Sequence, residues 1–117
     1  MTRDPRALLW DARASADAIV RFLSGKSFDD YLADEILRSA VERQFEILGE
    51  ALAQLSKADS KLAARVPNAG NAIGFRNVLI HGYAKVDSAI VWQAATQALP
   101  KLRSAVDALL RNLGDTP

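Results

Sequence analysis

Apolar residues recur at three- and four-residue steps along almost the whole chain, and no other feature constrains the fold as strongly. This spacing places apolar side chains on one face of a helix. The first such stretch follows Asp4-Pro5, which suits a helix start because aspartate caps free N–H groups and proline at the first helical position loses no hydrogen bond. Neither strand-like alternation nor an Asn-Gly or Asp-Gly hairpin turn occurs. The sequence therefore predicts an all-α fold.

The expected helices are bounded by capping or stop residues: Pro5 to a stop at Gly25, Tyr31–Leu55, Asp59–Val66, Asn68–Ile80 and Ser88–Leu113. Pro100 lies inside the last helix and is expected to kink it, because proline removes one backbone hydrogen bond. We expect one antiparallel bundle of four to five helices that forms a single domain over residues 1–113, followed by a short tail over residues 114–117.

The composition removes several classes of chemistry. A chain of 117 residues is long enough to bury a core without disulfide bonds or a structural metal. The absence of cysteine excludes disulfides, zinc ribbons, iron–sulfur clusters and a cysteine nucleophile. A single histidine excludes a multi-histidine metal site within one chain. We therefore expect no metal and no other cofactor.

The charge is nearly balanced overall but unevenly distributed. A net charge of +1 argues against a surface covered in basic groups for non-specific binding of nucleic acid. Residues 1–56 carry seven basic and ten acidic side chains, whereas residues 57–117 carry eight basic and four acidic ones, so an anion is expected to bind in the second half. No apolar run is long enough to span a membrane and the N-terminus lacks a signal-peptide pattern, so we expect a cytoplasmic protein with no membrane partner.

The side chains best suited to chemistry lie in the stretch Gly74–Tyr83, which reads GFRNVLIHGY. Asn77 and His81 are four residues apart and share one face of the predicted helix. The three apolar residues between them are expected to point largely to the core. The glycine that follows His81 is expected to end the helix or bend the chain. Four polar side chains are thus expected to meet at one helix terminus: Arg76, Asn77, His81 and Tyr83.

Each of these side chains also has a structural explanation. A lone histidine near a helix end is often a cap or a satisfied core residue. An arginine on a helix is commonly solvated, and a tyrosine can pack at the edge of the core with its hydroxyl in water. Spacing alone therefore leaves a structural role open beside a catalytic one.

The same residues resemble the R-x4-H-x-Y motif, with a polar residue after the arginine, of HEPN-domain toxins of the HepT type. The resemblance covers nearly the whole chain. Ala40–Ala51 (AVERQFEILGEA) is similar to the second-helix signature of the family, and Val91-Trp92 and Leu99–Leu102 (LPKL) are similar to its C-terminal helix. Two positions differ: Ala69 stands where tryptophan is frequent, and Ala84 stands where a larger side chain is common.

The resemblance implies a metal-independent endoribonuclease toxin of a type VII toxin–antitoxin pair, which cleaves RNA as a homodimer. It implies catalytic roles for Arg76 and His81 and a supporting role for Asn77. It also implies a partner, a minimal nucleotidyltransferase antitoxin of the MntA type, which transfers AMP to Tyr83 and so silences the nuclease. The attached phosphate would occupy the Arg76 site that the scissile phosphate needs.

The single histidine adds a constraint on RNA cleavage without a metal. Such cleavage needs a base for the 2′-hydroxyl, an acid for the leaving 5′-oxygen and positive charge at the phosphate. Histidine suits proton transfer near neutral pH, and arginine binds phosphate oxygens. One chain lacks a second histidine, whereas a twofold dimer would supply two copies of His81 and of Arg76. We therefore expect the site at a subunit interface.

Other candidates favour structural roles. Glu42, Glu46 and Glu50 repeat at four-residue steps, but no Glu-x-x-His motif accompanies them, so they are interpreted as a solvated or intersubunit face. Trp10 and Trp92 are interpreted as packing or interface anchors. Two rival functions stay open: a non-catalytic helical module that binds a nucleotidyltransferase partner or a nucleotide, and a dimerisation bundle without a ligand.

Overall fold

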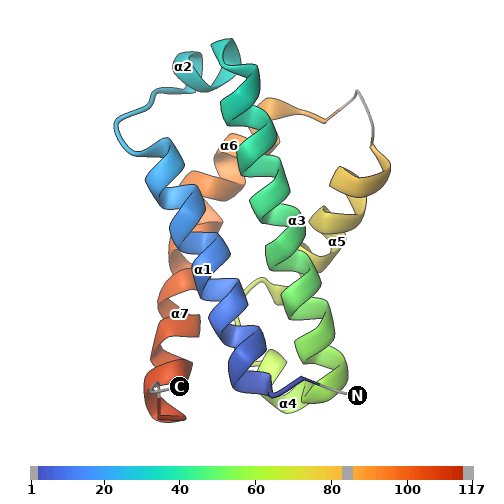
Figure 1. Cartoon of the computed structure of the whole chain (residues 1–117). Helices are drawn as coiled ribbons and strands as arrows, with labels where there is room; N and C mark the ends of the chain where they lie inside the picture. Colours follow the sequence, from blue (N-terminus) through green and yellow to red (C-terminus); the bar gives the residue numbers. More distant parts are fainter. Residues whose placement is uncertain (1–2, 83–85, 115–117) are drawn as a thin grey trace.

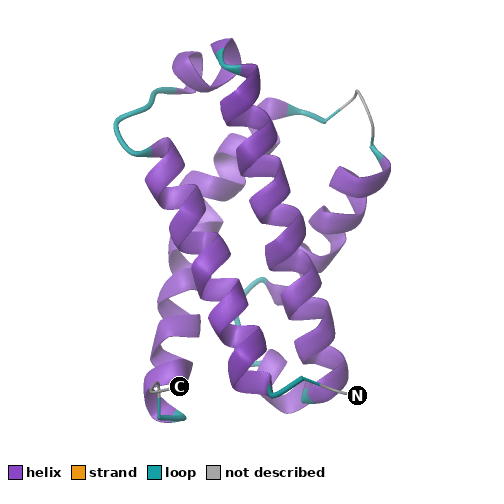
Figure 2. Cartoon of the chain, in the orientation of Figure 1, coloured by secondary structure: helices purple, strands orange, loops and turns teal. Residues whose placement is uncertain are grey.

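The computed structural model describes residues 3–82 and 86–114, and within these ranges it contains helices and no strand (Figure 2). Long helical segments run alternately up and down (Figure 1): α1 (Pro5–Leu23), α3 (Glu35–Ala58), α5 (Ala69–His81), and a last segment made of α6 (Ser88–Gln93), the π-helical η2 (Ala94–Ala98) and α7 (Leu99–Asn112). Two short helices, α2 (Phe28–Ala33) and α4 (Ser60–Ala63), lie in the connections. The expected all-α bundle is confirmed.

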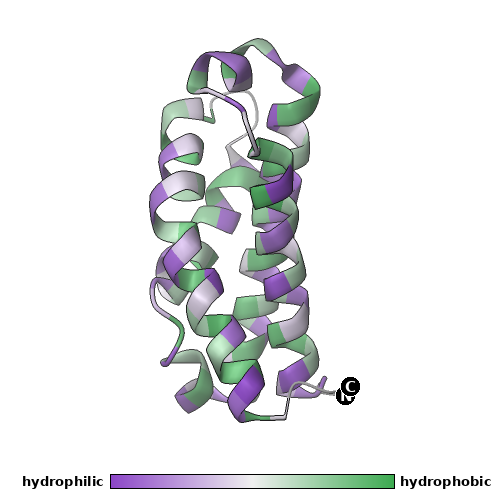
Figure 3. Cartoon of the chain, turned by 90° about the vertical axis from the view of Figure 1, so that its left-hand side faces the viewer, coloured by the Kyte–Doolittle hydropathy of each residue, from purple (hydrophilic) through white to green (hydrophobic). Residues whose placement is uncertain are grey.

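The core lies between α1, α3 and α7. α1 packs against both α3 and α7, and each helix carries hydrophilic as well as hydrophobic residues (Figure 3). Burying one aliphatic side chain contributes about 1.5–3 kcal/mol, so the apolar faces dominate the stability of the bundle. None of the helices within the described ranges has the length and apolar character needed to cross a membrane. The fully buried side chains include Leu8, Leu9, Ile19, Leu48, Leu52, Leu55, Val106 and Leu110.

The single long helix expected over Tyr31–Leu55 is wrong at its start. α2 ends at Ala33, and the carboxylate of Asp34 accepts a hydrogen bond from the backbone N–H of Leu37 at 3.0 Å, which caps α3. A capping box also starts α2. There the Ser27 hydroxyl accepts from the Asp30 N–H at 3.0 Å, and the Asp30 carboxylate accepts from the Ser27 N–H at 2.9 Å. Two N-terminal caps so close together favour two helices over one.

The chain changes its backbone hydrogen bonding directly before Pro100. In η2, the N–H of Leu99 donates to the carbonyl of Ala94, five residues earlier, instead of four. The carbonyl of Trp92 accepts a hydrogen bond from the Thr96 hydroxyl at 2.8 Å. A local π turn of this kind is a common cause of helix bending. The expected disturbance at Pro100 therefore takes the form of a π turn on its N-terminal side.

α5 packs mainly against α3 and lies at the side of the bundle (Figure 1). An apolar groove of about 260 Å³, whose lining includes Phe75 and Leu102, lies between α5 and the last helical segment. Leu79 is buried, but the side chains of Val78 and Ile80 are 56% and 47% exposed. The expectation that all three face the core is wrong, because successive helical residues point about 100° apart and α5 has one main neighbour.

Candidate active site

α3 and α5 approach each other closely at Gly49. A Cβ built on this glycine would lie 2.8 Å from the carbonyl oxygen of Ala72, and it would collide with the Cβ of Arg76. A side chain at this position would force the two helices apart, since the Ala72 oxygen belongs to the backbone and cannot move alone. The glycine thus lets the stem of Arg76 lie directly against α3, where its side chain is 20% exposed.

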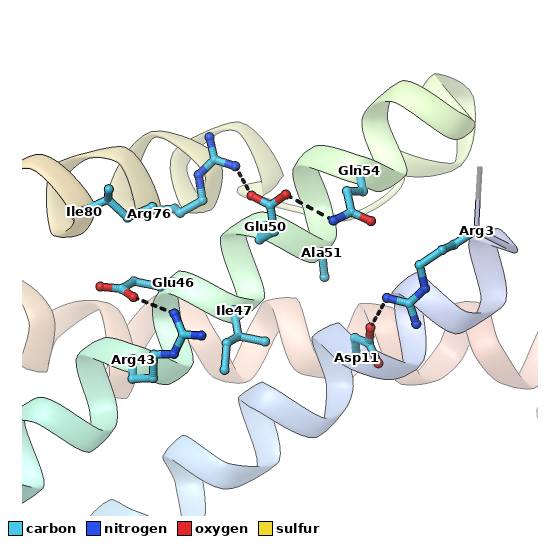
Figure 4. Close-up of a pocket in the computed structure, with 10 residues that line it drawn as sticks. All are labelled: Arg3, Asp11, Arg43, Glu46, Ile47, Glu50, Ala51, Gln54, Arg76 and Ile80. Atoms are coloured by element: carbon cyan, nitrogen blue, oxygen red, sulfur yellow. Dashed lines mark hydrogen bonds and ion pairs between the residues drawn. The ribbon is translucent and has the colours of Figure 1, made fainter. Parts of the chain in front are cut away.

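The Arg76 guanidinium is held by two helices. On α5, its Nε and Nη2 atoms donate to the Oδ1 atom of Asn77 at 3.1 and 2.6 Å. Its Nη1 atom forms an ion pair with the Oε2 atom of Glu50 on α3. The other oxygen of Glu50 accepts from the Nε2 atom of Gln54 at 3.1 Å. Figure 4 shows Arg76 extending from α5 to Glu50, with Gln54 on the far side of that carboxylate.

Glu50 remains ionised beside Arg76. The hydrogen bond from Gln54 is the largest cause that lowers the pKa of Glu50 below its ordinary value of 4.5. Partial desolvation acts in the opposite direction, and the hydrogen bond and charge of Arg76 lower the pKa further. The carboxylate therefore carries its charge throughout the neutral pH range.

A groove of about 290 Å³ runs beside this ion pair, between α1, α3 and α5. Two more arginines line it, and each is paired with a carboxylate: Arg3 with Asp11 at 2.6 Å and Arg43 with Glu46 at 3.0 Å (Figure 4). The apolar side chains of Ile47 and Ile80 complete part of the wall. In the described part of the chain, no group of three or more His, Asp or Glu residues is arranged to hold a metal ion.

The structure brings together some of the predicted site residues. Arg76 and Asn77 are hydrogen bonded to each other, whereas His81 is the exposed last residue of α5. A separation of five residues turns His81 about 140° around the helix and about 7.5 Å along it relative to Arg76. Within the described residues, no hydrogen bond or ion pair connects these two side chains. Tyr83 and Ala84 lie outside the described residues.

Sequence reasoning missed the contribution of α3 to this site. Glu50 was interpreted as part of a solvated or intersubunit face, and the structure pairs it with Arg76. A signal was present in the stretch Ala40–Ala51, where Gly49 interrupts an otherwise strong helix-forming sequence directly before Glu50. A glycine inside a helix often marks a place where another backbone comes close.

A family model described as ribonuclease HepT-like matches residues 12–109. The chain belongs to the HepT-like ribonuclease family. The match includes the Arg76-to-His81 stretch as well as α3 and most of the last helical segment. Family membership confirms the expected HEPN-like fold class and the expected enzyme class, an RNA nuclease.

Several relatives of this HepT-like chain align over nearly their whole length. A protein of Methanocaldococcus jannaschii, provisionally named an RNase, is 30% identical over 90% of this chain and 95% of its own. A provisionally named RNase of Caldanaerobacter subterraneus is 31% identical over 93% of this chain and 96% of its own. A Thermococcus cleftensis protein, provisionally named ribonuclease HepT, is 29% identical over 93% of this chain and 98% of its own. No solved structure gives a significant match.

Proposed function

We propose that this HepT-like chain is a metal-independent endoribonuclease toxin that cleaves RNA as a homodimer. In this proposal a nucleotidyltransferase antitoxin neutralises the toxin by transferring AMP to Tyr83. The observation that carries the proposal is the fixed Arg76 guanidinium at the motif position of a ribonuclease family that spans most of the chain. Family membership supplies the ribonuclease class. The toxin role, the metal-free chemistry and the antitoxin are the parts that we propose.

Arg76 is suited to bind the scissile phosphate. A guanidinium is permanently charged and presents N–H donors in a planar fork that matches phosphate oxygens. Asn77 holds one edge of this fork, so the group enters the reaction already oriented. His81, exposed at the end of α5, would transfer protons to and from the ribose and leaving-group oxygens.

A second copy of the chain would complete the site. One chain supplies one histidine, and helical geometry directs it to a different side of α5 from Arg76. The outer surface of α5 also exposes Val78 and Ile80 beside the motif, and such apolar side chains suit burial against another subunit. A twofold dimer built around α5 would bring the Arg76 and His81 of both chains into one cleft.

Tyr83 is proposed as the modified residue because it follows the exposed His81 by two positions in the motif. An attached AMP would place a phosphate near the guanidinium of Arg76. Competition for this positive charge and steric exclusion by the base would together block RNA.

Cleavage of RNA in excess EDTA tests the nuclease proposal. We expect wild-type protein to cleave, and we expect His81→Ala and Arg76→Ala to lose at least about 100-fold in rate, the usual scale for removing a proton-transfer or charge-stabilising group. Arg111→Ala is the matched control, since Arg111 is an exposed, ion-paired arginine on α7. Equal cleavage by all four proteins would indicate a contaminating nuclease, and loss of wild-type activity on chelation would contradict the metal-free mechanism.

Intact-mass spectrometry after co-expression with a cognate nucleotidyltransferase tests the modification. We expect the toxin mass to rise by one or more AMP units, and Tyr83→Phe to abolish the increase. Tyr31→Phe is the matched control, because Tyr31 is the other tyrosine of the chain and is buried. An increase that persists in Tyr83→Phe would place the acceptor elsewhere.

A further inference from the structure

We propose that Glu50 is a positioning residue that orients the Arg76 guanidinium toward the scissile phosphate. This inference rests on the proposed ribonuclease function, in which Arg76 contacts the phosphate. Glu50 would act through Arg76 and would not itself touch the RNA.

The first support is the pattern of donors that Arg76 uses. A guanidinium carries five N–H groups. Asn77 accepts from Nε and from Nη2, and Glu50 accepts from Nη1, so three N–H groups are engaged within the described residues. Two N–H groups remain, one on each Nη atom. Because Asn77 and Glu50 engage different nitrogens, they fix the rotation of the planar group and therefore the direction of the remaining donors.

The second support is that Glu50 is itself held in place. Gln54, one helical turn further along α3, donates to the carboxylate oxygen that does not contact Arg76. Gly49, the preceding residue, sets the close approach of α3 and α5 at Arg76. A chain of contacts thus runs from Gln54 through Glu50 and Arg76 to Asn77. Such supporting contacts are what keep a catalytic group in its productive geometry.

The third support comes from comparing the ion pairs that line the groove. Arg43 and Glu46 both lie on α3, and Arg3 pairs with Asp11 of α1. The pair of Glu50 and Arg76 joins two helices and involves the motif arginine. The Glu50 side chain is 52% exposed, and ion pairs at such exposed sites contribute little to folding stability. The ion pair of Glu50 and Arg76 is therefore expected to contribute little to folding stability. Its direct effect is to orient the Arg76 guanidinium.

Steady-state RNA cleavage by Glu50 variants tests the proposal. We expect Glu50→Ala to lower kcat about tenfold or more with KM changed less than about threefold, because the arginine keeps its charge but loses its orientation. Glu50→Gln retains an oxygen acceptor and should recover most of the rate. Glu46→Ala is the matched control: the same residue type one turn earlier on α3, paired with Arg43, and expected to cleave like wild type. The Tm of all variants should stay close to that of wild type.

A rate for Glu50→Ala equal to the wild-type rate would overturn the proposal. A faster rate would also overturn it and would identify Glu50 as a competitor of phosphate for Arg76. An equal loss of rate in Glu46→Ala would attribute the effect to the general charge of the groove instead.

A measurement without RNA separates this inference from the proposed function. Solvent exchange of the Arg76 Nε–H in the free protein, followed by ¹⁵N NMR, should be faster in Glu50→Ala than in wild type and unchanged in Glu46→Ala. If wild-type protein fails to cleave RNA in EDTA, the proposed function fails while this measurement still tests the link between Glu50 and Arg76. Unchanged exchange in Glu50→Ala would overturn the positioning role.

Discussion

Gly49 on α3 and Arg76 on α5 lie against each other with no room for a methyl group between them. The fold and the proposed catalytic group therefore depend on the same contact. The helix crossing that brings α5 to the bundle also decides where the guanidinium lies relative to Glu50.

Gly49→Ala should lower both stability and activity. The added methyl group would meet the Ala72 carbonyl oxygen at 2.8 Å and would push α5 away from α3. Overpacking of this kind costs about 1–3 kcal/mol, which urea denaturation measures directly. Gly74→Ala is the control, since a Cβ at Gly74 meets no atom within 4 Å, and alanine in a helix is favoured over glycine by up to about 1 kcal/mol. Equal stability of Gly49→Ala and wild type would contradict the close crossing.

Tyr31→Phe should leave stability unchanged or raise it. The Tyr31 ring is buried beside Trp92, at 5.7 Å between centroids, but its hydroxyl has no hydrogen-bond partner among the described residues. Burial also raises the pKa of Tyr31 to about 12. Removing an unpaired buried hydroxyl relieves a desolvation cost of about 1–3 kcal/mol in favourable cases. Thermal unfolding would reveal the change, and a clear loss of stability would indicate a partner for the hydroxyl.

The capping box of α2 should make the folding stability depend on pH, with a loss of stability in acid. Hydrogen bonds from the backbone N–H and the hydroxyl of Ser27 hold the pKa of Asp30 below its ordinary value of 3.8. A depressed pKa means that the stabilisation is complete above pH 3.8 and is lost as the pH falls through the lower folded-state pKa. Asp30→Asn should therefore lower Tm at neutral pH, and its Tm should approach that of wild type in acid, as the pH falls below the folded-state pKa of Asp30.

The neighbouring substitution Asp29→Asn is the control for this pH effect. Asp29 lies in the same first turn but is not part of the capping box. Its Tm difference from wild type should be smaller at neutral pH. If the Tm difference between Asp30→Asn and wild type were as large in acid as at neutral pH, the loss of Tm would not depend on the charge of Asp30.

Refolding wild-type protein together with an equal amount of His81→Ala should lower RNA cleavage more than dilution alone. Random pairing makes about a quarter of the dimers wild type, and only these carry two copies of His81 in the cleft. We expect about a quarter of the rate of the same total amount of wild-type protein, whereas a site within one chain would retain about half. Retention of half of the rate would contradict a cleft that needs His81 of both chains.

Local patterns predicted most of the helices. Asp4-Pro5 and the apolar spacing after it define α1, and the start of the last segment after Asp87 follows the same rules. The break at Asp34 differs from the expected continuous helix because the apolar spacing continues across it, whereas the structure caps α3 there with the Asp34 carboxylate. The exposure of Val78 and Ile80 depends on how many neighbours α5 has, and the spacing of residues along one helix does not contain that information.

The site was predictable where its residues are close in sequence. Arg76 and Asn77 are adjacent in the sequence, and the motif contains both. The partnership of Arg76 with Glu50 spans 26 positions and depends on the crossing of α3 and α5 at Gly49. Long-range contacts of this kind arise from tertiary packing, which the periodicity of either helix leaves undetermined.

The one-sided packing of α5 has a consequence for how the bundle opens. Local opening is easiest where few apolar contacts must be broken. In α5 only Leu79 is buried, Ile73 and Phe75 are partly buried against the core, and a groove separates α5 from the last helical segment. Amide hydrogens of α5 should therefore exchange with deuterium sooner than those of α1 and α3. The helix that carries Arg76 and His81 would detach transiently while the rest of the core stays folded. A ligand or partner that binds to α5 should therefore slow hydrogen exchange in α5 more than in the other helices.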